Sequence, residues 1–142
     1  MCLTATPPEI FLVSSCLVGL CTRYDGQAKP DNICINRLKK TIWIPVCPEQ
    51  LGGLPTPREA ADIIGGDGKQ VLAGQACVLT KSSGVDVTAE FINGARQVLK
   101  IAQSQNITAA FFKSKSPSCG VTGTIGVTAA LLQAHGIDVQ EF

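Results

Sequence analysis

Short apolar runs of strand length alternate with segments of helical pattern along this chain, and this alternation limits its fold more than any other feature. The runs at residues 10–14 (IFLVS) and 107–113 (ITAAFFK) are typical of strands that are buried on both faces. Residues 41–46 (TIWIPV) are a further candidate strand, although Pro45 is awkward inside a sheet. Strands that alternate with helices predict βαβ units and a mainly parallel sheet. We therefore expect an α/β three-layer sandwich with helices on both faces of the sheet.

Helical patterns separate these strands. Asp31 is the expected N-cap of the first helix, and Thr88 is that of the longest one, in which apolar residues recur at helical spacing. Asn106 is the expected end of this long helix, and Gly136 is a good C-cap for the last helix. Residues 48–74 are rich in glycine and proline, and no element is predicted there. The predicted helices cover residues 31–40, 88–106 and 127–135, and further strands are expected at residues 76–80 and 137–139.

The composition excludes several classes of protein. A length of 142 residues predicts a single domain over residues 1–142. Hydrophobic residues make up 45% of the chain and charged residues only 16%, which excludes a disordered chain. The net charge is +1 without any block of one sign, which argues against a binder of duplex DNA. Aromatic residues make up 5%, which argues against a platform for stacking single-stranded bases.

Two segments superficially resemble targeting or membrane segments. The apolar run at residues 10–21 is not preceded by any lysine or arginine, and a signal peptide needs such a basic start. Residues 116–137 carry no Asp, Glu, Lys or Arg, but Pro117 and four glycines break this stretch too often for a membrane span of about 20 apolar residues. We therefore expect a cytoplasmic protein that does not contact a membrane. The low charged fraction is compatible with an oligomer.

The seven cysteines are an odd number, and without a secretory signal they do not indicate a disulfide framework. A reducing compartment, in which thiols are kept for chemistry or metal binding, is the better interpretation. Cys16 follows the first predicted strand, Cys47 follows the second, and Cys119 comes a few residues after the strand that ends near Lys113. Ligands of open α/β sheets bind beyond the carboxyl ends of the strands, so we expect these three cysteines to converge at one edge.

Three converging thiolates suit a soft metal centre, either zinc or an iron–sulfur cluster. A fourth ligand would close such a site and make it structural or electron-carrying, whereas an open position would make it catalytic. Free cysteines are also common as small buried hydrophobic residues, and the pattern by itself leaves both interpretations open. Cys21 follows Cys16 at a spacing that is only weakly typical of ferredoxins. Cys34 and Cys77 are expected in the core, and Cys2 at a frayed terminus.

Five motifs follow one another along nearly the whole chain: CLVGLCTRYDG, VCPEQLGGLPTPR, GVDVTAEFINGA, SPSCG and GVTAALLQAHGI. Together they resemble the thiouracil desulfidase family of bacterial proteins. The resemblance implies an enzyme with a Rossmann-like core and a [4Fe–4S] cluster that is held by Cys16, Cys47 and Cys119, with the fourth iron left open. That iron would bind the thiocarbonyl sulfur of the substrate. C=S would become C=O with release of sulfide and without a redox change.

Further residues of these motifs become candidates through the same resemblance. Iron bound to sulfur makes the attached carbon more electrophilic, and a positioned base must then activate the attacking water. Glu49, two residues after Cys47, is the candidate for this base. Ser116 is a candidate for relaying a proton or holding the substrate. Glu49 as a cap and Ser116 as a turn former remain structural alternatives. Arg23, Asp25 and Lys113 are candidates for substrate binding, and ordinary ion pairs are the alternative for them.

The chain also departs from the family pattern. Only residues 121–125 connect SPSCG with GVTAALL, where the family usually has a longer glycine-rich loop, so part of the pocket wall is expected to be missing. Family members with a fused helical domain are associated with thiolated tRNA. No such domain follows here, which favours a free thiopyrimidine base or nucleotide over tRNA. Arg58 is expected to anchor a loop that its neighbouring proline stiffens.

Two other functions stay open at this point. The first is a non-catalytic iron–sulfur or zinc protein, in which a residue such as Cys21 completes the site. The second is a metal-free α/β domain that binds a small molecule. Iron content separates both from the desulfidase, because only the closed site loses its metal when Cys21 is replaced, and the metal-free domain takes up no iron.

Overall fold

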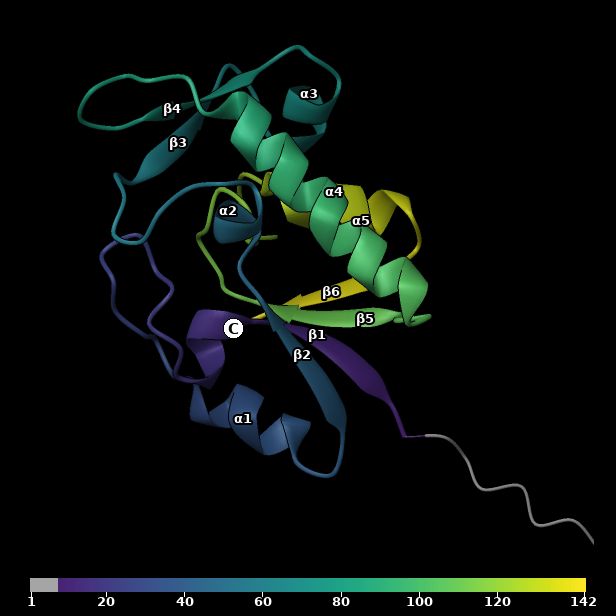
Figure 1. The fold of residues 1–142 in the computed structure, drawn as a ribbon. Coiled ribbons are helices and arrows are strands. Elements are labelled where there is room, and N and C mark those ends of the chain that lie inside the picture. The colour runs from purple at the N-terminus through teal and green to yellow at the C-terminus, as the bar shows by residue number, and fades with distance from the viewer. Residues whose placement is uncertain (1–7) are drawn as a thin grey trace, which may run out of the picture.

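A parallel sheet forms the centre of the computed structural model, which describes residues 8–142 (Figure 1). Cys2 therefore lies outside the described residues. Over this range four strands pair in the order β2-β1-β5-β6, and all three pairings are parallel. The prediction of a mainly parallel sheet is confirmed. The strands are β1 (Ile10–Ser14), β2 (Ile42–Val46), β5 (Ala109–Phe112) and β6 (Asp138–Glu141).

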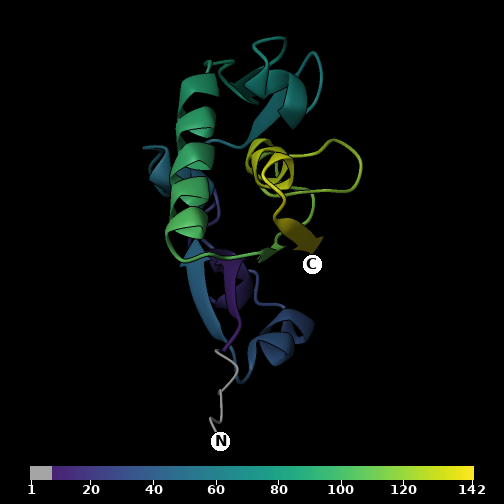
Figure 2. The same cartoon turned by 90° about the vertical axis from the view of Figure 1, so that its right-hand side faces the viewer.

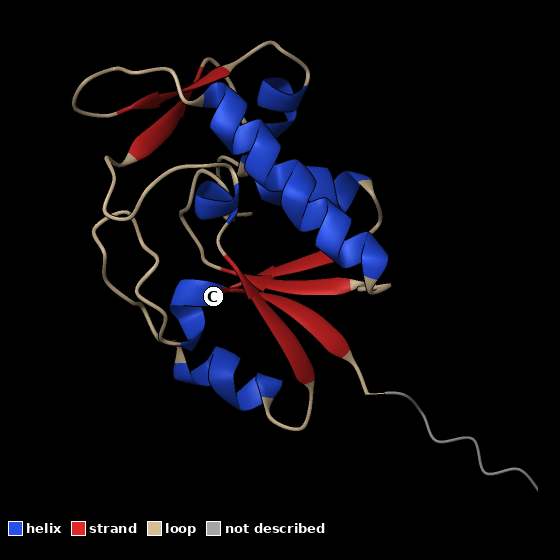
Figure 3. Ribbon diagram, viewed as in Figure 1, coloured by secondary structure: helices blue, strands red, loops and turns tan. Residues whose placement is uncertain are grey.

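Helices cover both faces of this sheet (Figure 3). Side chains alternate along a strand, so Leu12 and Ala110 point to one face while Val13 and Phe111 point to the other. The first face packs against α4 (Thr88–Ser104) and α5 (Val127–Ala134). The second face packs against α1 (Asn32–Leu38) and against η1 (Ser15–Val18), a 3₁₀ turn that directly follows β1.

A second, two-stranded sheet lies beside the N-terminal end of α4 (Figure 2). The predicted strand at residues 76–80 is present as β4 (Cys77–Thr80), but it pairs antiparallel with β3 (Ala61–Ile64) and not with the parallel sheet. Residues 48–74, for which no element is predicted, contain β3 and two short helices. These are α2 (Pro48–Leu51) and α3 (Gly68–Leu72), the latter with a capping box between Asp67 and Gln70.

The helix ends follow the predictions in part. Asp31 caps α1, because its carboxylate accepts from the Cys34 N–H at 2.9 Å. The predicted cap at Thr88 is wrong. Val87 occupies the N-cap, and the Thr88 hydroxyl accepts from the Val78 N–H at 2.9 Å, which ties α4 to β4. Across residues 8–142, no helix combines the length and the apolar character that a membrane crossing requires.

The strand order determines where a ligand can enter. β1 lies between β2 and β5, so the chain leaves β1 toward one side of the sheet and later returns to build the other side. Connections that run in opposite directions leave a crevice outside the carboxyl ends of the strands. Ser14 ends β1, Val46 ends β2 and Phe112 ends β5, so the segments that follow these residues surround this crevice.

Candidate active site

A cavity of about 430 Å³ lies at the carboxyl ends of β1, β2 and β5. Cys16, Cys47 and Cys119 all line it. Cys16 comes from η1, Cys47 is the N-cap residue of α2, and Cys119 lies in the turn that follows β5. The structure thus brings together the three cysteines that were expected to converge because each follows a predicted strand.

The thiols of Cys16 and Cys119 are buried, that of Cys47 is partly buried, and the three influence one another. Burial raises the pKa of Cys119, and the neighbouring Cys47 and Cys16 raise it further. Burial raises the pKa of Cys16 as well, again with a contribution from Cys47. Thiols of this kind are neutral until a metal replaces their protons. A metal centre held by all three would therefore form with release of protons.

Three cysteine thiolates are a donor set that suits a soft metal centre. A single tetrahedral metal ion with metal–sulfur bonds of about 2.3 Å would draw its ligand atoms close together. No three His, Cys, Asp or Glu side chains in the part of the chain that the structure describes are gathered in this way. The three cysteines line a shared cavity, and cysteine thiolates are the usual ligands of iron–sulfur clusters.

Ser116 shapes the turn that carries Cys119. Its hydroxyl oxygen accepts from the N–H of Ser118 at 3.2 Å and from that of Cys119 at 3.1 Å, and its carbonyl accepts from the Gly120 N–H at 2.9 Å. Ser116 also lines the cavity. It therefore acts as a turn former and at the same time lies where a ligand would contact it.

The same turn is attached to the start of α5. The first three N–H groups of this helix donate to the carbonyl oxygens of Pro117 and Ser118 at 2.9–3.0 Å. Gly126 leaves no room between the two segments, since a Cβ atom there would lie 2.7 Å from the backbone nitrogen of Cys119. The position of Cys119 is consequently set by β5 on one side and by α5 on the other.

Glu49 is held by two neighbours on the cavity wall. Its Oε1 atom accepts from Arg58 Nε at 2.9 Å, and its Oε2 atom accepts from the Ser118 hydroxyl at 3.3 Å. Both charged side chains are largely buried, with exposed fractions of 15% for Glu49 and 6% for Arg58. Ser118, which sequence reasoning did not single out, is thus the serine that contacts the candidate base.

Arg58 does more than anchor a loop. Besides Glu49, its guanidinium donates to the Thr22 carbonyl at 3.0 Å and to the Thr56 hydroxyl at 2.9 Å. It also lies 3.7 Å from Cys47 Sγ. Sequence reasoning missed this contact with a cysteine. The only sequence signal for this contact is that Arg58 lies in the same motif as Cys47 and Glu49.

The remaining candidates differ in whether they line the cavity. Lys113 and Arg23 line the cavity, whereas Asp25 does not. Asp25 lies 4.0 Å from Arg23 and accepts from the Gln27 N–H at 3.0 Å. Burial lowers the pKa of Lys113, and the nearby Arg23 lowers it further, although the Cys16 thiolate would raise it. Asp25 is therefore placed to orient Arg23 and not to face the cavity directly.

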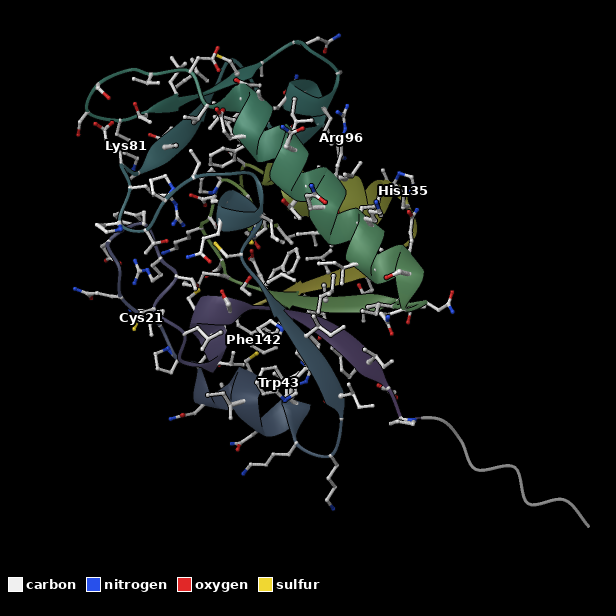
Figure 4. All side chains as sticks on the ribbon, viewed as in Figure 1. Cys21, Trp43, Lys81, Arg96, His135 and Phe142 are labelled. Atoms are coloured by element: carbon white, nitrogen blue, oxygen red, sulfur yellow. The ribbon has the colours of Figure 1, made fainter. Side chains whose placement is uncertain are left out.

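Cys21 lies apart from this constellation. It is exposed, it does not line the cavity, and Figure 4 shows it on the outer loop. Cys34, a residue of α1, is fully buried against the sheet, as expected for a core cysteine. Cys77 is only partly buried, at the start of β4.

The short connection before α5 is tied to the last strand of the sheet. The N–H groups of Val121 and Thr122 donate to Glu141 at 2.7 and 3.1 Å, which holds this connection against β6. A groove of about 310 Å³ separates it from β3. This groove shares the segment around Ser116 and Pro117 with the main cavity.

Comparison with known proteins places this geometry in a family. Residues 11–141 match the family described as 2-thiouracil desulfurase. The chain belongs to this family. The uncharacterized protein YbbK of Bacillus subtilis (strain 168) is 41% identical over 143 residues, which cover 92% of this chain and 93% of YbbK. A solved structure of the [4Fe-4S]-dependent thiouracil desulfidase TudS is 38% identical, with a TM-score of 0.78 over 94% of this chain and 90% of TudS.

Membership of the 2-thiouracil desulfurase family confirms the resemblance that the five motifs carry, and the match to TudS confirms the fold class. The alignment with YbbK spans 143 residues, although only 92% of this 142-residue chain takes part in it, so YbbK contributes residues that have no counterpart here.

Proposed function

We propose that this chain is a [4Fe–4S]-dependent desulfidase that converts the C=S group of a thiouracil-type pyrimidine into C=O. Water supplies the oxygen atom and sulfide leaves, so the reaction balances without an oxidant or a reductant. The observation that carries the proposal is the convergence of Cys16, Cys47 and Cys119 on one cavity that also contains Glu49. Its support from outside the chain is the likeness to TudS, which is a [4Fe-4S]-dependent thiouracil desulfidase.

The three cysteines are the proposed cluster ligands. The cavity wall, as far as the structure describes it, contains no fourth cysteine, which supports an iron without a protein ligand. When bound, the cluster supplies a Lewis acid that withdraws electrons from the thiocarbonyl carbon through its sulfur. The protein's part is to place the pyrimidine, to exclude bulk water and to activate one water molecule.

Glu49 is the proposed base. It is the only carboxylate among the described residues that line the cavity. Arg58 and Ser118 hold one oxygen atom each, which fixes the plane of the carboxylate while each oxygen keeps a further lone pair for a water proton. A positioned base of this kind accelerates proton transfer by about 100-fold or more.

The charges on the cavity wall favour a small anionic or electron-rich substrate. Arg23, Lys29, Lys113 and Lys115 line the cavity, while its single carboxylate is already paired with an arginine. These cations suit a thiopyrimidine base that has lost a proton, or the phosphate of its nucleotide. Tyr24 adds an aromatic face to the same wall. We therefore propose a thiopyrimidine base or nucleotide as substrate in preference to tRNA.

The test is sulfide release from thiouracil and from its nucleoside monophosphate by anaerobically reconstituted protein. Glu49→Gln preserves the size of the side chain but removes the base, so we expect kcat to fall about 100-fold or more while the iron content stays the same. Glu59→Gln, which replaces an exposed carboxylate bonded to Ser83, is the matched control and should keep full activity. Cluster-loaded wild-type protein that releases no sulfide would overturn the proposal.

A further inference from the structure

Arg58 is a buried cation in which every donor has a partner. A guanidinium carries five N–H groups. In this structure Nε donates to Glu49, Nη1 faces the Thr56 hydroxyl and the Pro55 carbonyl, and Nη2 faces the Thr22 carbonyl and Cys47 Sγ. Five acceptors thus surround five donors on a side chain that is only 6% exposed. Such complete pairing fixes both the place and the orientation of the guanidinium plane.

Two of these contacts connect a proposed cluster ligand with the proposed base. Cys47, a proposed cluster ligand, lies 3.7 Å from Nη2, and Glu49, the proposed base, lies 2.9 Å from Nε. A single rigid plane therefore spans both residues. The Cys47 thiol also donates to the Thr22 carbonyl at 3.7 Å, a bond that disappears once the sulfur loses its proton to bind iron. Arg58 remains as the donor that faces both the sulfur and this carbonyl.

The position of the positive charge has an electrostatic consequence. A buried charge is screened less by water and salt than an exposed one. A positive donor at a cluster sulfur stabilises the state with one more electron, and hydrogen bonds to sulfur are among the factors that set cluster potentials. Arg58 lies close to Cys47 Sγ, so it would act on a bound cluster through this proposed ligand sulfur.

We propose that Arg58 is a positioning residue that couples the cluster to the base: it holds Cys47 and Glu49 in fixed relation and raises the reduction potential of the bound cluster through its contact with the Cys47 sulfur. The inference rests on the proposed function, since it presumes a cluster at the three cysteines. Lysine cannot take over this role, because an ammonium has three donors and lacks the planar fork that reaches both residues at once.

The experiment measures the midpoint potential of the 2+/1+ couple and the rate of iron release to a chelator in reconstituted protein. The variants are Arg58→Lys and Arg58→Gln, each checked for folding by circular dichroism. Arg96→Lys, an arginine on the exposed side of α4 (Figure 4), is the matched control. We expect a lower potential in both Arg58 variants, with the larger shift in Arg58→Gln, and iron release at least several-fold faster than in the control.

The sign of the shift separates this role from a merely structural one. A loosened loop would admit water, which stabilises the reduced cluster and raises its potential, whereas loss of the Arg58 donor lowers it. Glu49→Gln removes a nearby negative charge and should shift the potential upward, opposite to Arg58→Gln. If Arg58→Gln cannot hold the cluster, the potential of Arg58→Lys decides.

Two results would count against different parts of the account. A wild-type chain that binds no iron would contradict the proposed function. A wild-type chain that binds the cluster, together with Arg58 variants whose potential is unchanged or raised, would overturn this inference and leave the proposed function standing.

Discussion

Replacing Gly94 with alanine should disturb the candidate active site, although Gly94 lies on α4 and does not line the cavity. Gly94 lies where α4 packs against α2, the short helix that begins after Cys47 and carries Glu49. A Cβ atom there would lie 2.8 Å from the carbonyl carbon of Pro48 and would overlap its oxygen. Carbon atoms pack at about 3.5 Å or more, so α2 must move by at least about 0.7 Å.

The consequence can be estimated from two opposing effects. Alanine is favoured over glycine inside a helix by about 1 kcal/mol. Overpacking a tight contact costs about 1–3 kcal/mol, and the backbone of α2 cannot rotate away as a flexible side chain could. The overlap with the Pro48 backbone oxygen places this cost at its upper end, so we expect Gly94→Ala to lower the free energy of unfolding by about 2 kcal/mol. A shift of α2 also exceeds the roughly 0.5 Å within which functional groups must be held, so iron retention and turnover should fall as well.

The assay is urea denaturation of cluster-free protein together with iron content after reconstitution. Asn93→Ala, at the exposed neighbouring position of α4, is the matched control and should be neutral or slightly stabilising. The reasoning would be refuted if Gly94→Ala were as stable as Asn93→Ala and retained its full iron content.

Two further predictions concern buried groups around the sheet. Burial raises the pKa of Cys34 from 9.0 to about 11, so the unfolded chain loses this proton at lower pH than the folded one, and stability should fall as the pH rises from about 9 to 11. The effect is about 2 kcal/mol, and urea titrations at several pH values should give a flatter profile for Cys34→Ala. Ser14→Ala should cost about 1–2 kcal/mol, because the Ser14 hydroxyl accepts from the Lys113 N–H at 2.9 Å and hydrogen-bonds Cys119. Its iron release should be faster than that of wild-type protein, and equal rates would contradict the assigned contact.

The arrangement of the cysteines could be predicted because it depends on local signals. Apolar runs locate the strands, and the carboxyl ends of parallel strands meet at one edge, so the neighbours of Ser14 and Val46 had to converge. The caps at Asp31 and Asp67 depend equally on local chemistry, although only the first was predicted.

Other features depend on contacts between distant residues. Thr88 has the sequence signature of a cap, but β4 offers its hydroxyl a competing backbone donor. Arg58 reaches Thr22 across 36 positions, and Ser118 reaches Glu49 across 69. No local pattern encodes such pairs. The pairing of β3 with β4 outside the main sheet was missed for the same reason, since antiparallel partners depend on tertiary packing.

The central claim is that three cysteines hold one cluster, and iron with acid-labile sulfide per chain tests it most directly. Anaerobically reconstituted wild-type protein should contain about four of each, as a [4Fe–4S] cluster requires. Cys16→Ala, Cys47→Ala and Cys119→Ala should each lose most of both, whereas Cys21→Ala, at an exposed position, should keep them. Well-folded wild-type protein without iron, or a full iron content in any of the first three variants, would contradict the account.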